Sequence, residues 1–361
     1  MLKANFLAHA LISVLIDTYN HERFIEKAIV SVLQQDFPAA AREIIVVDDG
    51  SADRTPEILR QFESQIRYIR KQNGGQASAF NAGIPECQGE IIAFLDGDDF
   101  WLPGKLARVA DAFAANPSVG LVGHAIAESL PDGSSRVSAP AKEQRFLVSS
   151  LSTARDFRLR KSFLGTSRMA MRTELARRIL PIPEALVIEA DEYLFTLAAV
   201  FSEVMILRQP LTCYVLHGGN LFVSAGKGAA GLRRKQRVLA TLARELSKVL
   251  RAHHVAENII SCIVEIVAAE ADQLRLMLDG GSPWHAFRTE NKIFQVLHSD
   301  ASGSQRFFRA LSMIPALLLP PRWFYAGRSW LSERSWYRSM RKGTLPVPRI
   351  ANIASSEEFK N

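Results

Sequence analysis

The chain has 361 residues, of which 48% are hydrophobic and 22% are charged, a balance that is typical of a globular protein and excludes a disordered one. Its three cysteines (Cys87, Cys213 and Cys262) are too few and too scattered for a disulfide framework or a zinc site. No stretch reaches the ~18–20 apolar residues that a membrane-spanning helix requires.

Positive charge is concentrated towards the end of the chain. The formal net charge is +7, and residues 301–350 hold eight arginines and one lysine against a single glutamate, a net of +8. Near the start, residues 6–16 imitate a signal peptide but run into a polar turn without a cleavage pattern. We interpret this stretch as a buried strand and expect a cytoplasmic protein, free or at the cytoplasmic face of a membrane.

The first part of the chain alternates short strands with helices. Hydrophobic spacing predicts strands over residues 11–16, 43–47, 66–69 and 90–95, and helices over residues 24–33, 56–62 and 77–84. Short connections between alternating strands and helices favour an α/β fold, with a mostly parallel sheet that helices cover on both faces.

The following part is more mixed. We predict helices over residues 103–115, 173–180 and 191–201, and strands over residues 119–127, 164–167, 204–207 and 211–216. Residues 131–133 form a turn signal and residues 136–145 resemble a loop. After a Gly/Ala-rich segment that ends at residue 231, residues 232–278 have an almost continuous helical pattern, with a break near His253 and His254.

Each early strand is followed at once by a polar cluster. These clusters occupy residues 17–20, 48–51 and 96–99. Because ligands bind beyond the carboxyl ends of strands in such sheets, we expect the three turns to meet at one rim. The carboxylates Asp96, Asp98 and Asp99 would repel one another unless a cation lay among them, and their hard oxygens suit Mg²⁺ or Mn²⁺. The alternative is a helix-capping turn, since Asp and Gly are also common turn residues.

Four ordered blocks resemble the family 2 glycosyltransferases. They are SVLIDTYN at 13–20, IIVVDDGS at 44–51, NGGQ at 73–76 with NAG at 81–83, and LDGDD at 95–99, within a match over about residues 11–220. The resemblance implies an inverting enzyme of the GT-A fold that uses nucleotide-sugar donors. It implies a catalytic domain over residues 1–225. The helical pattern and the composition of the rest of the chain predict a helical region (226–300) and a basic, aromatic-rich tail (301–361).

The resemblance also implies a donor site. The Tyr19 ring would lie against the nucleobase, and Asp49, or less favourably Asp48, would accept a hydrogen bond from a base N–H. The full set of expected donor-binding residues is Thr18, Tyr19, Asn20, Asp48, Asp49, Gly75, Gln76, Asn81, Asp96 and Gly97. Phe80 stands where the family commonly has an arginine, which leaves neutralisation of the diphosphate to the metal or to Arg70, Lys71 or Lys105.

Asp96 and Asp98 form the DxD motif of the family, in which one carboxylate contacts the ribose and Asp98 or Asp99 holds Mg²⁺ or Mn²⁺. Metal ligands are therefore expected among Asp96, Asp98, Asp99 and His217, the last resembling a His-x-x-Asn segment of the family. His217 could equally have a structural role.

For the catalytic base, Asp191 matches the Asp of a Glu-Asp pair that begins a helix in the family, with Ala190 in place of the Glu. The helix N-terminus would keep the Asp191 carboxylate ionised. Glu189 and Glu192 are the alternative bases, and simple helix capping is the alternative role for Asp191.

The expected substrates are a nucleoside-diphosphate sugar, a UDP-sugar above others, and a saccharide or lipid-linked acceptor of cell-surface glycan or polysaccharide synthesis.

The tail interleaves aromatic residues with arginines, which suits a peripheral contact with an anionic membrane. A helical subdomain or an oligomer contact is the alternative, and no nucleic acid is expected. Other possible activities are a polyprenyl-phosphate sugar synthase, a nucleotidyltransferase and a non-catalytic nucleotide-sugar binder.

Overall fold

The computed structural model describes residues 11–130, 134–217, 228–297 and 303–333. The chain divides into two compact units, Met1–His217 and Gly218–Asn361. The division of functions among a catalytic domain, a helical region and a tail stays a prediction. The predicted turn at residues 131–133 and most of the Gly/Ala-rich segment lie outside the described residues.

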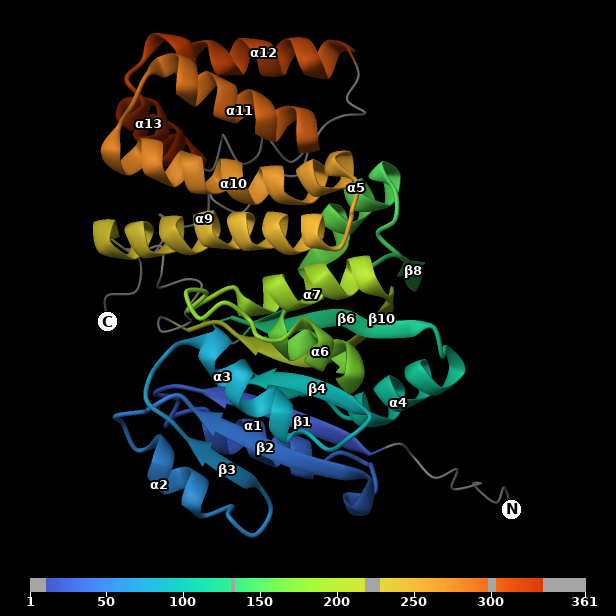
Figure 1. Cartoon of the computed structure of the whole chain (residues 1–361). Coiled ribbons are helices and arrows are strands. Elements are labelled where there is room, and N and C mark those ends of the chain that lie inside the picture. The colour runs from blue at the N-terminus through green and yellow to red at the C-terminus, as the bar shows by residue number, and fades with distance from the viewer. Residues whose placement is uncertain (1–10, 131–133, 218–227, 298–302, 334–361) are drawn as a thin grey trace. The chain divides into compact units, whose positions relative to one another are not determined.

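The first unit is built on a mixed, mostly parallel sheet (Figure 1). Its strands in spatial order are β3 (Arg67–Arg70), β2 (Arg42–Asp48), β1 (Ile12–Thr18), β4 (Ile91–Asp96), β9 (Ala170–Arg172), β6 (Val119–Ser129), β10 (Glu203–Val215) and β5 (Phe100–Trp101). The first four are parallel, β6 and β10 are parallel, and β9 joins the two sets by antiparallel pairing. Two further strands, β7 (Ser135–Ser138) and β8 (Gln144–Phe146), pair with β6 and β10.

Helices cover both faces of this sheet because the central strands are apolar on both sides. The helices are α1 (Ile25–Leu33), α2 (Thr55–Arg60), α3 (Gln76–Gly83), α4 (Lys105–Ala115), α5 (Leu151–Arg160), α6 (Thr173–Ile179) and α7 (Ala190–Phe201). On one face, Val14 of β1 packs in a cluster with Ile29 of α1 and Val109 of α4. On the other, the ring of Phe94 in β4 lies 5.5 Å from the ring of Phe80 in α3. The predicted α/β class with a mostly parallel sheet is confirmed.

The structure differs from the predicted elements after β6. Residues 164–167, predicted as a strand, lead into the short 3₁₀ turn Thr166–Arg168, and β9 follows it. The strands predicted over residues 204–207 and 211–216 are one strand, β10 (Glu203–Val215), because register shifts around Pro210 let it continue along β6. The predicted loop at 136–145 contains β7 and the start of β8; β7 is exposed along its whole length, so it lacks the apolar alternation that marks a strand.

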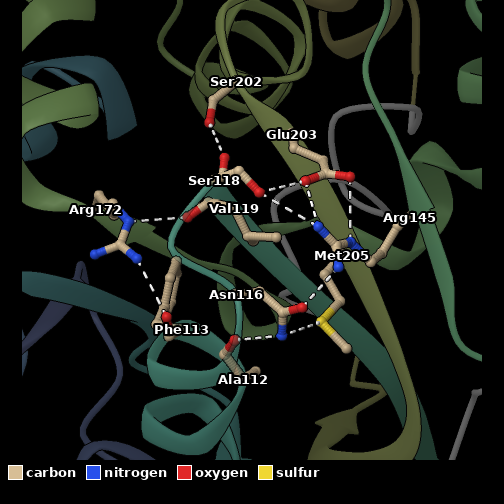
Figure 2. A network of polar contacts seen from close by, with 10 residues as sticks. All are labelled: Ala112, Phe113, Asn116, Ser118, Val119, Arg145, Arg172, Ser202, Glu203 and Met205. Carbon is tan, nitrogen blue, oxygen red and sulfur yellow. Dashed lines mark hydrogen bonds and ion pairs between the residues drawn. The ribbon is translucent and has the colours of Figure 1, made fainter.

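A polar network joins the beginnings of β6 and β10, at the end of these strands opposite the polar turns (Figure 2). Arg145 donates to Glu203 through Nε at 3.2 Å and through Nη2 at 2.5 Å, and its Nη1 donates to Asn116 at 2.7 Å. Arg172 of β9 donates to the carbonyl of Val119 at 2.9 Å. These contacts fix the amino ends of the strands whose carboxyl ends contribute to the site.

The second unit is helical. Its described helices are α9 (Gly228–Ala252), α10 (Glu257–Asp279), α11 (Pro283–Leu297), α12 (Gly303–Leu318) and α13 (Pro321–Glu333). The predicted break near His254 is confirmed, because this residue adopts a left-handed φ of 57° between α9 and α10. Among the described residues, no helix is both long and apolar enough to cross a membrane.

Candidate active site

The register of the central strands brings the three polar turns together. Thr18 at the end of β1 pairs with Asp48 at the end of β2, and Asp17 pairs with Asp96 at the end of β4. All three turns therefore leave the sheet at the same edge, as the sequence predicts.

The first two turns are joined by hydrogen bonds of Asn20. This residue adopts a left-handed φ of 57°, its N–H donates to Ser51 Oγ at 2.9 Å, and its Oδ1 accepts from the N–H of Ala52 at 2.8 Å. Asn20 therefore holds the turn after β1 against the turn after β2. The neighbouring Tyr19 is 37% exposed, so its ring is free of the core and accessible to a ligand.

The adjacent carboxylates of Asp48 and Asp49 have different surroundings. Asp48 is fully buried, and its two oxygens accept from the N–H of Ser51 at 2.8 Å and from the Tyr68 hydroxyl at 3.0 Å. These hydrogen bonds hold the turn, and the donor-binding role expected of Asp48 stays a prediction. Asp49 is also largely enclosed, but it faces a different segment, the loop that precedes α3.

Asp49 organises that loop. Its Oδ1 accepts from Lys71 Nζ at 2.8 Å and from the N–H of Gly74 at 3.0 Å, and its Oδ2 accepts from the N–H of Gly75 at 2.6 Å. Gly75 has a φ of +83°, and a Cβ there would lie 2.5 Å from Val187 Cα, so only glycine fits. A nucleobase N–H would have to share the Asp49 carboxylate with these donors.

Two of the expected donor-binding residues connect distant parts of the fold. Gln76 accepts from the N–H of Ala190 at 3.0 Å and donates to Thr166 Oγ1 at 3.1 Å. Asn81 makes two 2.8 Å hydrogen bonds with the backbone of Ile182. Gln76 thus fixes the beginning of α7, and Asn81 fixes the segment that leads to it.

Asp98 lies between two histidines. Its Oδ2 is 2.9 Å from His217 Nε2 and 3.9 Å from His21 Nε2, and the ring of Phe24 stacks on His217 with centroids 4.3 Å apart. Burial alone would raise the pKa of Asp98, but the hydrogen bond from His217 and the two imidazoles hold that pKa below its ordinary value. His21, which the sequence analysis did not single out, also bonds through Nδ1 to Thr18 Oγ1 at 3.1 Å.

Gly97 allows this close packing. A Cβ at Gly97 would lie 2.6 Å from Thr18 Oγ1 and 2.8 Å from His21 Nδ1. The glycine between the two aspartates of the DxD motif is therefore required by the contact between β1 and the turn after β4.

Three other carboxylates of this rim, Asp17, Asp96 and Asp99, have raised pKa values. Burial, followed by the charge of Asp98, raises the pKa of Asp99 to about 8. Burial and neighbouring carboxylates also raise the pKa values of Asp17 and Asp96, each of which feels the charge of Asp191. Within the described residues, Asp17 Oδ1 and Asp99 Oδ2 are buried without a hydrogen-bond partner. These carboxylates lie close together, and the positive charge around them is too small to keep all of them ionised.

This electrostatic imbalance fits a divalent cation. In the part of the chain that the structure describes, no three His, Cys, Asp or Glu side chains converge as a complete metal site. Mg²⁺ and Mn²⁺ commonly use one or two protein ligands and take the rest from substrate phosphates and water. Asp98 with His217 fits such a partial site. Asp99 accepts from the N–H of Val215 through Oδ1 at 3.0 Å, and its Oδ2, which has no hydrogen-bond partner among the described residues, offers one further oxygen.

Asp191 lies in the first turn of α7. Its Oδ2 accepts from the N–H of Thr166 at 3.1 Å, and its Oδ1 accepts from the N–H of Glu192 at 2.8 Å. Burial is the main cause of a raised pKa at Asp191, which these hydrogen bonds only partly offset. Burial thus outweighs the helix N-terminus in setting the direction of this shift, and the ionised state expected of Asp191 stays a prediction. A raised pKa makes the carboxylate a stronger base.

The alternative base Glu192 is engaged elsewhere, because its carboxylate lies 2.5 Å from Lys161 Nζ. Glu189 adopts a left-handed φ of 63° at the residue before α7. The three cations suggested by the sequence also have protein partners: Lys71 contacts Asp49, Arg70 donates to the carbonyl of Ser51, and Lys105 is fully buried.

Two residues of the Thr166–Arg168 turn, Ser167 and Arg168, were given no role in the site by the sequence analysis. Ser167 Oγ accepts from the N–H of Asp96 at 3.0 Å and donates to Asp96 Oδ2 at 3.2 Å, while Lys105 Nζ donates to the carbonyl of Ser167 at 2.7 Å. The charge of Arg168 lowers the pKa values of Asp99 and Asp191. No local sequence signal marks these residues, since each acts through contacts with distant strands.

Comparison with known proteins agrees with this geometry. A family model described as glycosyl transferase family 2 matches residues 13–180. An uncharacterized glycosyltransferase of Nostoc sp. is 34% identical over 230 residues, which cover 61% of this chain and 69% of that protein. The chain belongs to the family 2 glycosyltransferases. The glycosyltransferase AglE of Haloferax volcanii is 35% identical over 130 residues, 34% of this chain and 41% of AglE.

Solved structures support the GT-A fold of this family 2 glycosyltransferase. TarS of S. aureus (residues 1–349) in complex with UDP-GlcNAc is 18% identical and covers 92% of each chain with a TM-score of 0.55. The mannosyltransferase PcManGT of Pyrobaculum calidifontis, in complex with GDP-Man and Mn²⁺, is 19% identical and covers 93% of this chain and 84% of its own, with a TM-score of 0.50. At these identities the likeness concerns the fold alone.

Proposed function

We propose that the chain is an inverting glycosyltransferase that moves a hexosyl or N-acetylhexosaminyl group from a nucleoside-diphosphate sugar to a hydroxyl of a saccharide or lipid-linked acceptor. A UDP-sugar is the favoured donor. Membership of family 2 supports sugar transfer. The observation that carries the proposal is that one turn, Thr166–Arg168, holds both Asp191, through the N–H of Thr166 at 3.1 Å, and the DxD carboxylate of Asp96, through Ser167 Oγ at 3.2 Å.

The proposed base is Asp191. Its carboxylate accepts the proton of the acceptor hydroxyl, and the acceptor oxygen attacks the anomeric carbon of the donor. The bond between that carbon and the diphosphate oxygen breaks, and the nucleoside diphosphate leaves with the electron pair. Because one displacement occurs, the configuration at the anomeric carbon inverts. The hydrogen bonds from the N–H groups of Thr166 and Glu192 orient the base.

The proposed metal ligands are Asp98 and His217, with His21 beside them. A bound Mg²⁺ or Mn²⁺ supplies Lewis-acid stabilisation of the diphosphate leaving group. On this proposal Asp96, which is held by Ser167, contacts the ribose, and the exposed ring of Tyr19 lies against the nucleobase. Asp49 holds the Gly74–Gly75 backbone next to the base and can share one oxygen with a base N–H.

We place the activity in cell-surface polysaccharide or glycan synthesis, in the cytoplasm or at the cytoplasmic face of the membrane. The free cysteines Cys87, Cys213 and Cys262 are all buried, in agreement with a reducing compartment.

The donor is tested by thermal shift with a panel of UDP- and GDP-sugars in the presence of Mn²⁺. A ligand that binds the native state raises its stability with the logarithm of occupancy, by ~2.7 kcal/mol at a hundred times Kd. We expect at least one nucleotide sugar to raise the melting midpoint, and EDTA to reduce that rise. No shift with any donor, with or without metal, would contradict the proposal. Nucleoside-diphosphate release then distinguishes an enzyme from a binder.

A further inference from the structure

The second unit presents an apolar surface that its own core does not use. Inward-facing residues of the helices, among them Leu276, Ala316 and Phe324, form a buried cluster. The exposed apolar residues of α12, α13 and the turn between them, here together called the α12–α13 apolar face, are Leu311, Ile314, Leu317, Leu318, Leu319, Trp323 and Trp330. Its helices are the orange-red elements of Figure 1.

Helical spacing places these residues in continuous rows. In α12, Leu311, Ile314 and Leu318 stand three and seven positions apart and share one side, while Met313 and Ala316 are buried on the other. Among its described side chains from residue 311 to residue 318, the helix is therefore apolar on both sides, and one side is buried.

In α13, two tryptophans stand seven positions apart and occupy the same side. Trp323 is 72% exposed and Trp330 is 54% exposed. Leu318, at the end of α12, is 74% exposed and lies five residues before Trp323. Large apolar side chains so fully exposed and so regularly spaced mark an interaction surface.

We propose that the α12–α13 apolar face binds the interface of an anionic lipid membrane. Tryptophan favours the headgroup level of a bilayer, and aliphatic residues on the same side reach the acyl boundary. The segment 301–350 that contains this face has a net charge of +8, and such basic segments are attracted to anionic headgroups. Surface apolarity and charge therefore favour the same partner.

Charge argues against two other partners. Two copies joined through the same face would bring two segments of +8 together, and these repel each other. A nucleic acid would use the basic charge and could stack on the tryptophans, but it leaves Leu311, Ile314 and Leu318 in water. Of these three partners, the lipid interface alone uses both the aliphatic row and the positive charge.

The test is sedimentation of the full chain with vesicles of phosphatidylcholine alone and with ~30% phosphatidylglycerol added. The variant carries Trp323→Ala and Trp330→Ala together. The control is Leu159→Ala, which truncates a 62% exposed leucine of α5 in the other unit. Melting midpoints show whether each variant folds, and sedimentation velocity without lipid measures self-association.

We expect wild type to bind the anionic vesicles ~10-fold or more tightly than the neutral ones, and ~0.5 M salt to weaken this binding because it screens charge. The double variant should lose ~10-fold or more in vesicle binding at an unchanged melting midpoint, whereas Leu159→Ala should bind as wild type does.

Three results would overturn the proposal. The first is equal vesicle binding by wild type and the double variant, and the second is no binding of wild type to anionic vesicles. The third is self-association without lipid by wild type and Leu159→Ala that the double variant no longer shows. Vesicle binding is measured without donor turnover. A negative binding result would therefore reject the membrane proposal and leave the proposed glycosyltransferase activity untouched.

Discussion

Asp98 Oδ2 lies 2.9 Å from His217 Nε2, although the two residues are 119 positions apart in the chain. Asp98 follows β4, and His217 follows β10, so their contact depends on the whole sheet between them. The pair links the acidic turn that the DxD motif predicts to the last residue of the first unit.

His217→Ala should weaken activation by Mn²⁺. If His217 holds the ion with Asp98, its removal raises the Mn²⁺ concentration for half-maximal activity by ~10–100-fold, the range seen when groups that support a metal are removed. The measurement is a Mn²⁺ titration of donor turnover. His285→Ala is a matched control, because His285 also lies beside a carboxylate, Asp272, but in the second unit. An unchanged Mn²⁺ requirement in His217→Ala would remove His217 from the metal site.

The pH profile of kcat/KM should report the raised pKa of Asp191. A base must be deprotonated, so activity is lost as pH falls through its pKa. Because burial raises that pKa, the acid limb should lie at a higher pH than the value of ~3.9 for an ordinary aspartate. The profile is measured at saturating Mn²⁺. Asp191→Glu should keep an acid limb with lower activity, whereas an unchanged profile in Asp191→Asn would contradict the assignment.

Asp99→Asn should stabilise the metal-free fold at high pH. The folded pKa of Asp99 is about 8 against an ordinary value of 3.8, so between these values the folded state holds the extra proton. The free energy of unfolding therefore falls as pH rises through this window. Asparagine does not titrate and keeps an acceptor for the N–H of Val215.

We accordingly expect the midpoint difference between Asp99→Asn and wild type to be more positive at pH ~8 than at pH ~5 in EDTA. Asp111→Asn is the control, since Asp111 is exposed on α4. A difference that shrinks with rising pH would show that Asp99 is not held in its neutral form.

Ser167→Ala should impair donor binding through Asp96. The substitution removes the acceptor of the Asp96 N–H and the donor to Asp96 Oδ2, which costs ~1–3 kcal/mol for a buried group left without a partner. We expect a lower melting midpoint and a higher KM for the nucleotide sugar. Ser202→Ala, which removes a hydrogen bond of the distant network in Figure 2, should leave KM unchanged. An unchanged KM in Ser167→Ala would separate Ser167 from the donor site.

The rim of the sheet could be predicted because each strand carries its own signal: an apolar run followed by polar residues. The same holds for α7, whose apolar spacing follows Asp191. The connecting roles of Gln76 and Asn81 could not be predicted, because their partners Ala190 and Ile182 are 114 and 101 residues away.

Burial of charge is the other part that sequence patterns do not reveal. Lys105 looks like a solvated lysine near the beginning of a helix, yet it is fully buried, with Nζ 4.3 Å from the centre of the Trp101 ring. Its pKa is lowered by that burial. Whether such a side chain is buried depends on packing between α4, β5 and β10, which cannot be read from a single sequence.

Release of nucleoside diphosphate from the donor by wild type and Asp191→Asn, with Mn²⁺ present and donor binding checked by thermal shift, tests the central claim most directly. We predict that Asp191→Asn binds the donor as wild type does, but turns it over ~10²–10⁴-fold more slowly, the usual contribution of a general base. Turnover of Asp191→Asn at the wild-type rate would contradict base catalysis by Asp191, and would favour an acceptor such as a phosphate that needs no base.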